Sequence, residues 1–316
     1  MSSQQHTYVS YINSKIIQRF SHRQGVVFGQ NVVAGSRISG LGAGIELEHN
    51  ITSINTPNAE NTLMGFGLGL MLGGIDSAFI MKQHDFALLG LDQITNTVNV
   101  LKNQTLEASF MIIMVVVDSG FEGPQASLNN LDEFASLSRT PVRFLNTTDN
   151  IDRAFSESTS PGFHMMALSQ KCMKLKLDPL DSRSTRLPFG ELIKSSDNAD
   201  FLLVFFGLDL AILNETITEA LEQNIKLDYV IAGEIADRFL FGNLNLGAYR
   251  SVVVCSTSKS EVTYAEKLAF ELMKMGMRVT MIGRASSKSW SQVSEDSPEF
   301  TSKDILTVFS EPNNEK

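Results

Sequence analysis

Along the first half of the chain, hydrophobic residues alternate between helical spacing and short uninterrupted runs. Residues 110–118 (FMIIMVVVD) form the clearest run, which predicts a strand buried on both faces, as in a parallel sheet covered by helices. Apolar positions at every third or fourth residue predict an amphipathic helix over 8–20. Further strands are predicted over 26–29, 51–55, 79–82, 141–146 and 163–169, and further helices over 86–101, 128–139 and 150–158. This alternation predicts an α/β domain.

A second alternation follows a polar stretch without periodicity. Strands are predicted over 201–207, 229–233, 251–257 and 278–283, and helices over 210–223 and 261–276. The pattern therefore predicts an α/β protein of two domains, each with a mainly parallel sheet covered by helices. We place the first domain at 1–175, the linker at 176–189 and the second domain at 190–316.

Between the second and third predicted strands lies a glycine-rich apolar segment. Residues 63–72 carry no charge, and Gly65, Gly69 and Gly73 recur every four residues. On a helix this spacing places the three glycines on one face, where the backbone of another helix can approach closely. The segment is well short of the roughly 20 apolar residues that span a bilayer. It therefore predicts a buried helix with a face suited to an interface.

Composition narrows the classes of partner. The 316 residues are 43% apolar and carry a net charge of −9, so the chain has no basic footprint for nucleic acid or for an anionic membrane. The N-terminus lacks the apolar core of a signal peptide, and two cysteines are too few for a disulfide framework. We expect a cytoplasmic protein. Zinc-ligand spacing, a Walker loop and a GxSxG elbow are all missing from the sequence.

Four sequence blocks in a fixed order carry a family resemblance. They are FGQNVVAGSRISGLGAGIE (28–46), INTPNAENTLMGFGLGLMLGG (54–74), QHDFALLGLDQITN (83–96) and DSGFEGP (118–124). Together they resemble the pyrimidine-binding domain of thiamine-diphosphate enzymes, above all the beta subunits of 2-oxoacid dehydrogenases and the C-terminal half of split transketolases. The second domain is similar, by pattern alone, to the transketolase C-terminal domain.

The resemblance implies roles for three residues of the first domain. Glu60, in TPNAE, corresponds to the catalytic carboxyl group that holds a ring nitrogen of the cofactor's aminopyrimidine, so that the cofactor can lose a proton and become a carbanion. Phe86 corresponds to the aromatic residue that stacks on that ring, and His84 lies where it can contact the ring edge or the substrate.

Each of these residues also has an ordinary structural explanation. Glu60 can be a helix N-terminal acid that favours the macrodipole, although Asn58 or Asn61 can cap the helix without charge. Phe86 can be a core residue, and His84 a solvated or internally hydrogen-bonded histidine. The block around Glu60 and Phe86 favours the functional interpretation for these two residues. For His84 the sequence does not decide between a functional and a structural role.

Within the four blocks, the sequence departs from the family at two places. Relatives carry a substrate-facing histidine after or near the GP pair, whereas this chain has GPQAS at 123–127, which leaves Gln125 as the candidate substrate residue. GQNV at 29–32 stands where many beta subunits have an acidic GEDV-like block. The first departure weakens the expectation of phosphorylated-sugar recognition and of acyl transfer to a lipoyl arm.

The diphosphate-binding half of the family's site is missing. Relatives bind Mg²⁺ and the diphosphate through a GDG block followed some distance later by an asparagine, and this sequence has no such pair. The resemblance thus implies thiamine diphosphate and Mg²⁺ as cofactors, with the metal ligands on an alpha-like partner subunit and an α2β2 heterotetramer as the assembly.

Three functions are consistent with these observations. The chain is a beta-like subunit of a two-chain enzyme that transfers or ligates an acyl or two-carbon ketol unit from a 2-oxoacid or ketose, a beta subunit of a 2-oxoacid dehydrogenase that feeds a lipoyl carrier, or a non-catalytic scaffold of the same fold. The retained carboxyl at Glu60 argues against the scaffold, because a buried carboxylate without a role is costly. The missing histidine argues against the dehydrogenase.

Overall fold

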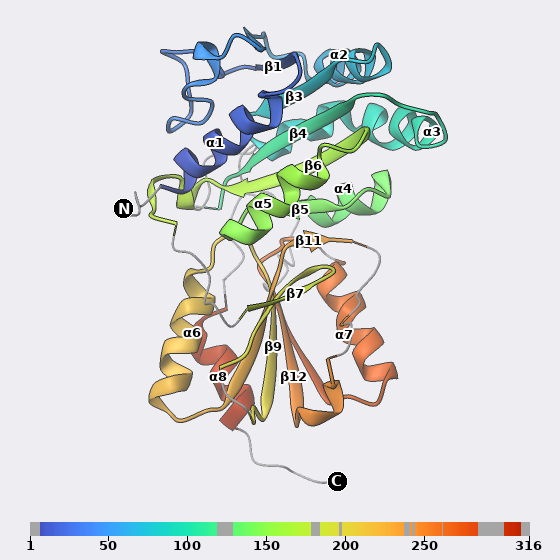
Figure 1. The fold of residues 1–316 in the computed structure, drawn as a ribbon. Coiled ribbons are helices and arrows are strands. Elements are labelled where there is room, and N and C mark those ends of the chain that lie inside the picture. The colour runs from blue at the N-terminus through green and yellow to red at the C-terminus, as the bar shows by residue number, and fades with distance from the viewer. Residues whose placement is uncertain are drawn as a thin grey trace, which may run out of the picture. The chain divides into compact units, whose positions relative to one another are not determined.

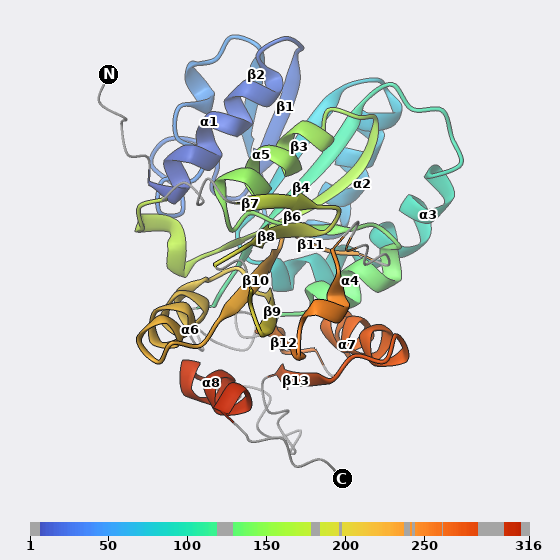
Figure 2. The same ribbon diagram turned by 60° about the horizontal axis from the view of Figure 1, so that its bottom comes forward.

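A computed structural model places most of the chain in two compact units, Met1–Leu180 and Asp181–Lys316. Each unit contains a mainly parallel sheet covered by helices, as the hydrophobic pattern predicts (Figures 1 and 2). The structure describes residues 7–118, 129–177, 184–195, 198–236, 241, 244–260, 262–283 and 300–310.

The described strands of the first unit pair in the order β2-β1-β3-β4-β6-β5, and all of these pairs are parallel. Gly29 lies opposite both Asn55 and Ile80, so the first three strands end at one level. The strands are β1 (Gly25–Gly29), β2 (Ile51–Asn55), β3 (Asp76–Met81), β4 (Ser109–Val116), β5 (Val142–Phe144) and β6 (Gly162–Ser169).

Helices cover both faces of this sheet (Figure 2). On one face lie α1 (Tyr8–Phe20) and α5 (Thr148–Glu157), and on the other lie α2 (Glu60–Leu72), α3 (Val98–Leu101) and α4 (Leu131–Ser138). Short helical turns complete the unit: η1 (Ile45–Leu47), η2 (His84–Gly90), η3 (Gln93–Thr97) and η4 (Lys171–Lys174).

Successive strand residues are buried on opposite faces, which accounts for the uninterrupted apolar runs. Val27 and Ile113 pack in the cluster that includes α1 and α5. Phe28 points to the other face, where its ring stacks on that of Phe79 with 5.1 Å between centroids and on that of Phe110 at 6.2 Å. The prediction of a sheet buried on both sides is therefore confirmed.

The glycine-rich segment forms helix α2, as predicted. Leu63, Met64, Leu68 and Met71 are buried on the sheet-facing side. The close approach within this chain occurs at Gly67, where an added Cβ would come within 2.2 Å of the Phe110 ring.

The region 86–101, predicted as one helix, is a succession of three helical types. A 3₁₀ turn, η2, is followed by a π-helical turn, η3, and by the short α3. Side chains here bond within the same turns: Asn96 donates to Asp92 at 2.7 Å and Thr97 donates to Gln93 at 2.8 Å. Apolar spacing alone does not distinguish these helical types.

The second unit has strand order β13-β12-β9-β10-β8-β7, with β8 antiparallel to β10 and β7 antiparallel to β8. Helices α6 and α8 pack together, and α7 packs on β12 and β13 (Figure 1). The elements are β7 (Ser184–Leu187), β8 (Gly190–Ile193), β9 (Phe201–Phe206), α6 (Ala211–Glu222), β10 (Leu227–Ala232), β11 (Glu234–Ile235), η5 (Leu246–Ala248), β12 (Ser251–Ser256), α7 (Tyr264–Lys274), β13 (Val279–Gly283) and α8 (Ser302–Ser310).

The stretch expected to be a linker, 176–189, contains strand β7, which pairs with β8. The sequence pattern missed β7 because it is a short edge strand in which Thr185 and Arg186 are exposed, so it carries no apolar run. Helix α8 was also missed, although its Phe309 ring packs 4.8 Å from that of Phe201.

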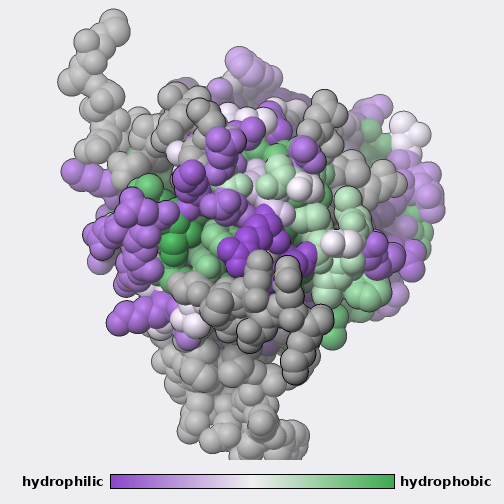
Figure 3. Space-filling view, turned by 90° about the horizontal axis from the view of Figure 1, so that it is seen from below, coloured by the Kyte–Doolittle hydropathy of each residue, from purple (hydrophilic) through white to green (hydrophobic). Residues whose placement is uncertain are grey.

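Apolar side chains also reach the surface. In the second unit Phe270, Met273 and Met275 are each at least half exposed. The face drawn in Figure 3 carries hydrophilic and hydrophobic residues side by side. Within the residues placed by the structure, no helix is long and apolar enough to cross a membrane.

Two glycines of α2 provide a test of this packing. Gly67→Ala places a Cβ against Phe110, and overpacking of this kind costs about 1 to 3 kcal/mol. At Gly69 a Cβ meets no atom within 4 Å, so Gly69→Ala gains helix propensity of about 1 kcal/mol. Urea unfolding of the isolated chain should rank Gly69→Ala above wild type and Gly67→Ala below it. The reverse order would contradict the packing of α2 on Phe110.

Candidate active site

Four residues of the candidate site, three of them predicted from the sequence, lie at the carboxyl edge of the first sheet. Gln30 follows β1, Glu60 begins the helix that follows β2, and His84 and Phe86 lie in η2 after β3. Parallel strands end at the same edge, and ligands of open α/β sheets bind in the crevice beyond those ends. The fold thus brings together residues that are more than 50 positions apart in the chain.

The turn after β1 is tightly held against its neighbours. An added Cβ at Gly29 would lie 2.2 Å from the Ile80 carbonyl oxygen, so only glycine fits between β1 and β3 at this point. The side-chain oxygen of Asn55 accepts hydrogen bonds from the backbone N–H groups of Val32 at 2.9 Å and Val33 at 3.1 Å. These contacts join the loop after β1 to the end of β2, directly before the TPNAE block.

The glycine-rich loop that follows is fixed from the opposite side. Asn13 of α1 donates to the Gly40 carbonyl at 2.9 Å and accepts from the Gly42 N–H at 2.8 Å. Both glycines have φ of 86°, a left-handed conformation that favours glycine. Arg37 forms an ion pair with Glu46 across the same loop.

Glu60 is 4% exposed and lies at the start of α2. Its Oε1 accepts a hydrogen bond of 2.7 Å from the Gln30 side-chain amide. Within the part of the chain that the structure describes, Oε2 has no hydrogen-bond partner. The helix begins after Ala59 without a side-chain cap bond. Glu60 lies in the first turn of α2, where the helix macrodipole also favours an acid. That its carboxyl group is held for a ligand therefore stays a prediction.

Sequence reasoning did not identify Gln30 as the partner of Glu60. The signal was the GQNV block, in which a neutral residue replaces the acid of related sequences. Gln30 is half-buried, and its amide group is a donor that a second carboxylate could not replace at 2.7 Å. The neutral residue at this position is consistent with a buried carboxyl beside it.

The turn that carries Phe86 packs on the first turns of α2. An added Cβ at Gly90, at the end of η2, would lie 2.6 Å from Met64 and 3.5 Å from the Glu60 carbonyl oxygen. Phe86 itself is half-buried. The structure thus brings the elements that carry Glu60 and Phe86 into contact. That the Phe86 ring stacks on a ligand stays a prediction.

His84 is fully buried. Its Nε2 accepts a hydrogen bond of 3.2 Å from the Asn130 backbone N–H, and its Nδ1 lies 3.5 Å from an Asp85 carboxylate oxygen. An accepting Nε2 carries no proton, which places the ring proton on Nδ1. These contacts join η2 to the segment before α4, so His84 has a structural role. A contact of His84 with a ligand stays a prediction.

The structure describes some of the remaining candidate residues but not all of them. Gln125 lies outside the described residues. Gly69 and Gly73 are exposed, and Gly65 lies 4.0 Å, measured from an added Cβ, from the Gln93 side chain. Beside this glycine face Phe66 is 42% exposed and Leu72 55% exposed. The glycine face is therefore open in the single chain, as an interface requires, and its partner stays a prediction.

No metal centre is formed by the described residues, which include no cluster of three or more His, Cys, Asp or Glu side chains able to hold an ion. This finding does not test where the metal ligands of the expected cofactor lie.

Comparisons with known proteins give a fold and no closer relationship. No family model matches the sequence, and no curated protein matches it. A solved structure titled as a split-gene transketolase, an inactive beta4 tetramer, superimposes with a TM-score of 0.68 at 15% identity over 95% of each chain.

A second solved structure supports the same fold. The transketolase of Campylobacter jejuni subsp. jejuni superimposes with a TM-score of 0.65 at 14% identity over 97% of this chain. The match covers 45% of the C. jejuni chain, so the present chain spans less than half of that protein. The chain has a transketolase-like fold.

The contact between Gln30 and Glu60 can be tested in the isolated chain. Gln30→Met keeps the length of the side chain and removes the donor, and hydrogen bonds to charged groups contribute about 1.5 to 3 kcal/mol. We expect the free energy of unfolding at neutral pH to fall by that amount. Gln18→Met, at an exposed position of α1, is the control and should change stability little. Equal stability of the two variants would contradict a buried Glu60 held by Gln30.

Proposed function

We propose that this chain is the beta-like subunit of a two-chain thiamine-diphosphate enzyme and supplies the pyrimidine-binding half of the site. The observation that carries the proposal is Glu60. Its carboxyl group is buried at the carboxyl edge of the sheet, with one oxygen held by Gln30 and the other without a partner in the described chain. A ligand that donates a hydrogen bond to Oε2 would satisfy this group.

The residues present fit an aminopyrimidine ring. Glu60 Oε2 is not among the fully buried side-chain atoms that lack a hydrogen-bond partner, so a ligand can reach it. Phe86, half-buried in η2 beside the start of α2, offers an aromatic surface of the kind on which a flat ring stacks. When bound, thiamine diphosphate supplies a nucleophilic carbon that accepts an acyl or ketol unit.

In this proposal Glu60 is the catalytic residue, and Gln30 positions it. Oε2 of Glu60 holds or receives a proton at a ring nitrogen, which is the task of a general acid–base group within hydrogen-bond reach. Gln30 donates to Oε1 and so fixes the rotation of the carboxyl group. Asn55, by holding the loop after β1, keeps Gln30 in place.

The diphosphate and Mg²⁺ are assigned to an alpha-like partner. Metal ions of this kind require oxygen ligands from protein and phosphate, and the sequence lacks the GDG and asparagine pair that supplies them in relatives. The similar split-gene protein is titled an inactive beta4 tetramer, which supports the view that a beta-type chain requires a second kind of subunit for activity. A heterotetramer with two copies of each subunit is the proposed assembly.

The proposed reaction transfers or ligates an acyl or two-carbon ketol unit from a 2-oxoacid or a ketose. The block GPQAS at 123–127 lacks the family's substrate-facing histidine, and Gln125 is the residue proposed in its place. The same absence disfavours acyl transfer to a lipoyl carrier. A scaffold without catalysis is the competing outcome, and the variants below distinguish it.

Glu60→Gln should abolish turnover while the assembled complex still forms. The change preserves shape and removes the group that shares the proton, and general acid–base groups contribute roughly two to four orders of magnitude in rate. The measurement is turnover of the complex of both chains, with assembly checked by size-exclusion chromatography. Activity within about threefold of wild type, far less than that range, would show that another residue carries this role.

The chain alone should not bind thiamine diphosphate with Mg²⁺, and addition of a GDG-bearing alpha-like chain should create the site. Gly69→Leu should block assembly, since overpacking of a close contact costs about 1 to 3 kcal/mol, without unfolding the subunit, because space around Gly69 is open in the single chain. Gln18→Leu on α1 is the matched control. Tight cofactor binding by the chain alone, or normal assembly of Gly69→Leu, would overturn this division of the site.

A further inference from the structure

A cavity of about 490 Å³ lies in the first unit, within the size range of small-molecule sites, roughly 300 to 1,000 Å³. Leu106 precedes β4, Pro141 precedes β5 and Phe163 lies at the start of β6, so the cavity lies at the amino ends of these strands. Glu60 and Phe86 follow the carboxyl ends of β2 and β3. The cavity is therefore separate from the proposed cofactor site.

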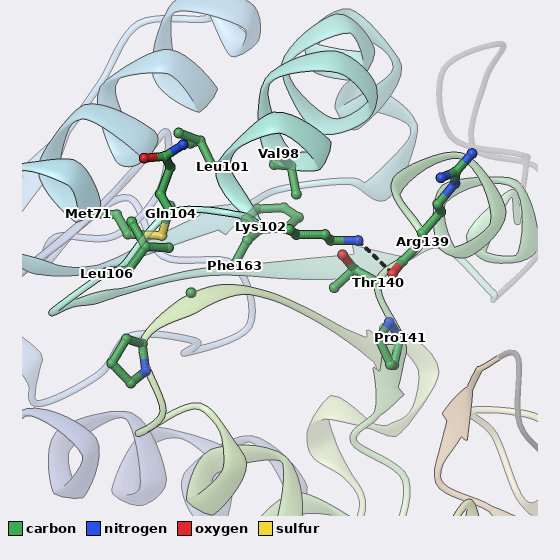
Figure 4. Close-up of a pocket in the computed structure, with 12 residues that line it drawn as sticks. Met71, Val98, Leu101, Lys102, Gln104, Leu106, Arg139, Thr140, Pro141 and Phe163 are labelled. Atoms are coloured by element: carbon green, nitrogen blue, oxygen red, sulfur yellow. Dashed lines mark hydrogen bonds between the residues drawn. The ribbon is translucent and has the colours of Figure 1, made fainter.

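Most of the cavity wall is apolar. Residues from α2, α3, the segment before β4 and the start of β6 surround it (Figure 4). The apolar lining residues are Met71, Val98, Leu101, Leu106, Pro141, Pro161 and Phe163. Such a wall suits a hydrocarbon chain or an aromatic ring rather than a fully hydrated ion.

Both charged residues of the wall are cations. Lys102 extends along the cavity toward Thr140, and Arg139 lies at the rim at the end of α4 (Figure 4). None of the twelve lining residues is acidic. The chain has a net charge of −9. The cavity wall is nevertheless positively charged, because its charged residues are both cations.

The two cations are not neutralised by the contacts they make. Lys102 Nζ donates to the backbone carbonyls of Ser138 at 2.5 Å and Arg139 at 2.6 Å, which satisfies the end of α4 and leaves the ammonium group a third donor. The Arg139 guanidinium makes no hydrogen bond within the described residues. Burial, and then the neighbouring Arg139 cation, lower the pKa of Lys102. Both residues are exposed, and an anion bound near both would offset this repulsion.

We propose that this cavity binds a small organic anion, with a carboxylate or phosphate group on Lys102 and Arg139 and an apolar body in the cavity. Arg139 is exposed and its guanidinium points away from the cavity in Figure 4, so the proposed binding requires its side chain to turn toward the opening when the anion binds. The proposal does not depend on the cofactor function, because no residue of the cavity belongs to the proposed active site.

Octanoate is a suitable first probe, measured by calorimetry on the full chain. Octanoate should bind, whereas acetate, which lacks the apolar body, and 1-octanol, which lacks the charge, should bind much more weakly. Octyl phosphate in parallel distinguishes phosphate from carboxylate recognition. Because the interaction is between charges, the affinity for octanoate should fall as salt is added.

Two variants separate a ligand role from a structural one. Lys102→Gln and Arg139→Asn should each weaken octanoate binding at least about tenfold, the effect of one lost charge-assisted hydrogen bond. Arg139 has φ of 51°, a conformation that asparagine tolerates, so Arg139→Asn remains informative if Lys102→Gln destabilises the end of α4. Lys303→Gln, exposed in the second unit, is the control.

Unchanged octanoate affinity in Arg139→Asn would overturn the proposal. Equal binding of 1-octanol and octanoate, or no binding of octanoate and octyl phosphate to the wild-type chain, would overturn it as well.

Discussion

The hydrogen bond from Gln30 to Glu60 is the contact on which the candidate site depends. A carboxylate that is 4% exposed needs donors, and the one donor described for it comes from the turn after a different strand. That turn is held in place by Asn55 at the end of β2 and by the close approach of Gly29 to Ile80. The position of one carboxyl group therefore depends on the parallel register of β1 with both of its neighbours.

The opposite edge of the sheet is held by a separate set of charges. Arg19 of α1 pairs with Asp76 at 3.3 Å and donates to the Ser109 hydroxyl at 2.5 Å and to the Ser158 carbonyl at 3.0 Å. Asp76 in turn accepts from the Ser109 backbone N–H at 2.7 Å. These buried contacts join the start of β3, the start of β4 and the end of α5. The amino edge is thus fixed by internal ion pairs, whereas the carboxyl edge keeps a carboxyl oxygen unpartnered.

Much of this fold could be predicted from the sequence, because strands buried on both faces read as apolar runs and helices as periodic stripes. The run that became β4 was predicted almost to its ends, and α1 was predicted from Tyr8 to Phe20. The pattern could not predict β7, an exposed edge strand, nor the 3₁₀ and π turns between β3 and α3, whose side-chain hydrogen bonds leave no trace in hydrophobic periodicity.

Only part of the candidate site could be predicted from the sequence. Glu60 and Phe86 were identified by resemblance, and their packing follows from contacts such as Gly90 against Met64. Gln30 could not be paired with Glu60 from sequence, because 30 residues and a strand pairing separate them. The burial of His84 behind the Asn130 N–H was likewise beyond the pattern, since a single histidine has no periodic signal.

The most direct measurement is the structure of the two-chain complex with thiamine diphosphate bound. The account predicts that Glu60 Oε2 lies within hydrogen-bond distance, about 2.6 to 3.2 Å, of a ring nitrogen of the aminopyrimidine, while Gln30 still donates to Oε1. An aminopyrimidine ring bound away from Glu60, or a Glu60 side chain turned toward its own helix, would contradict it.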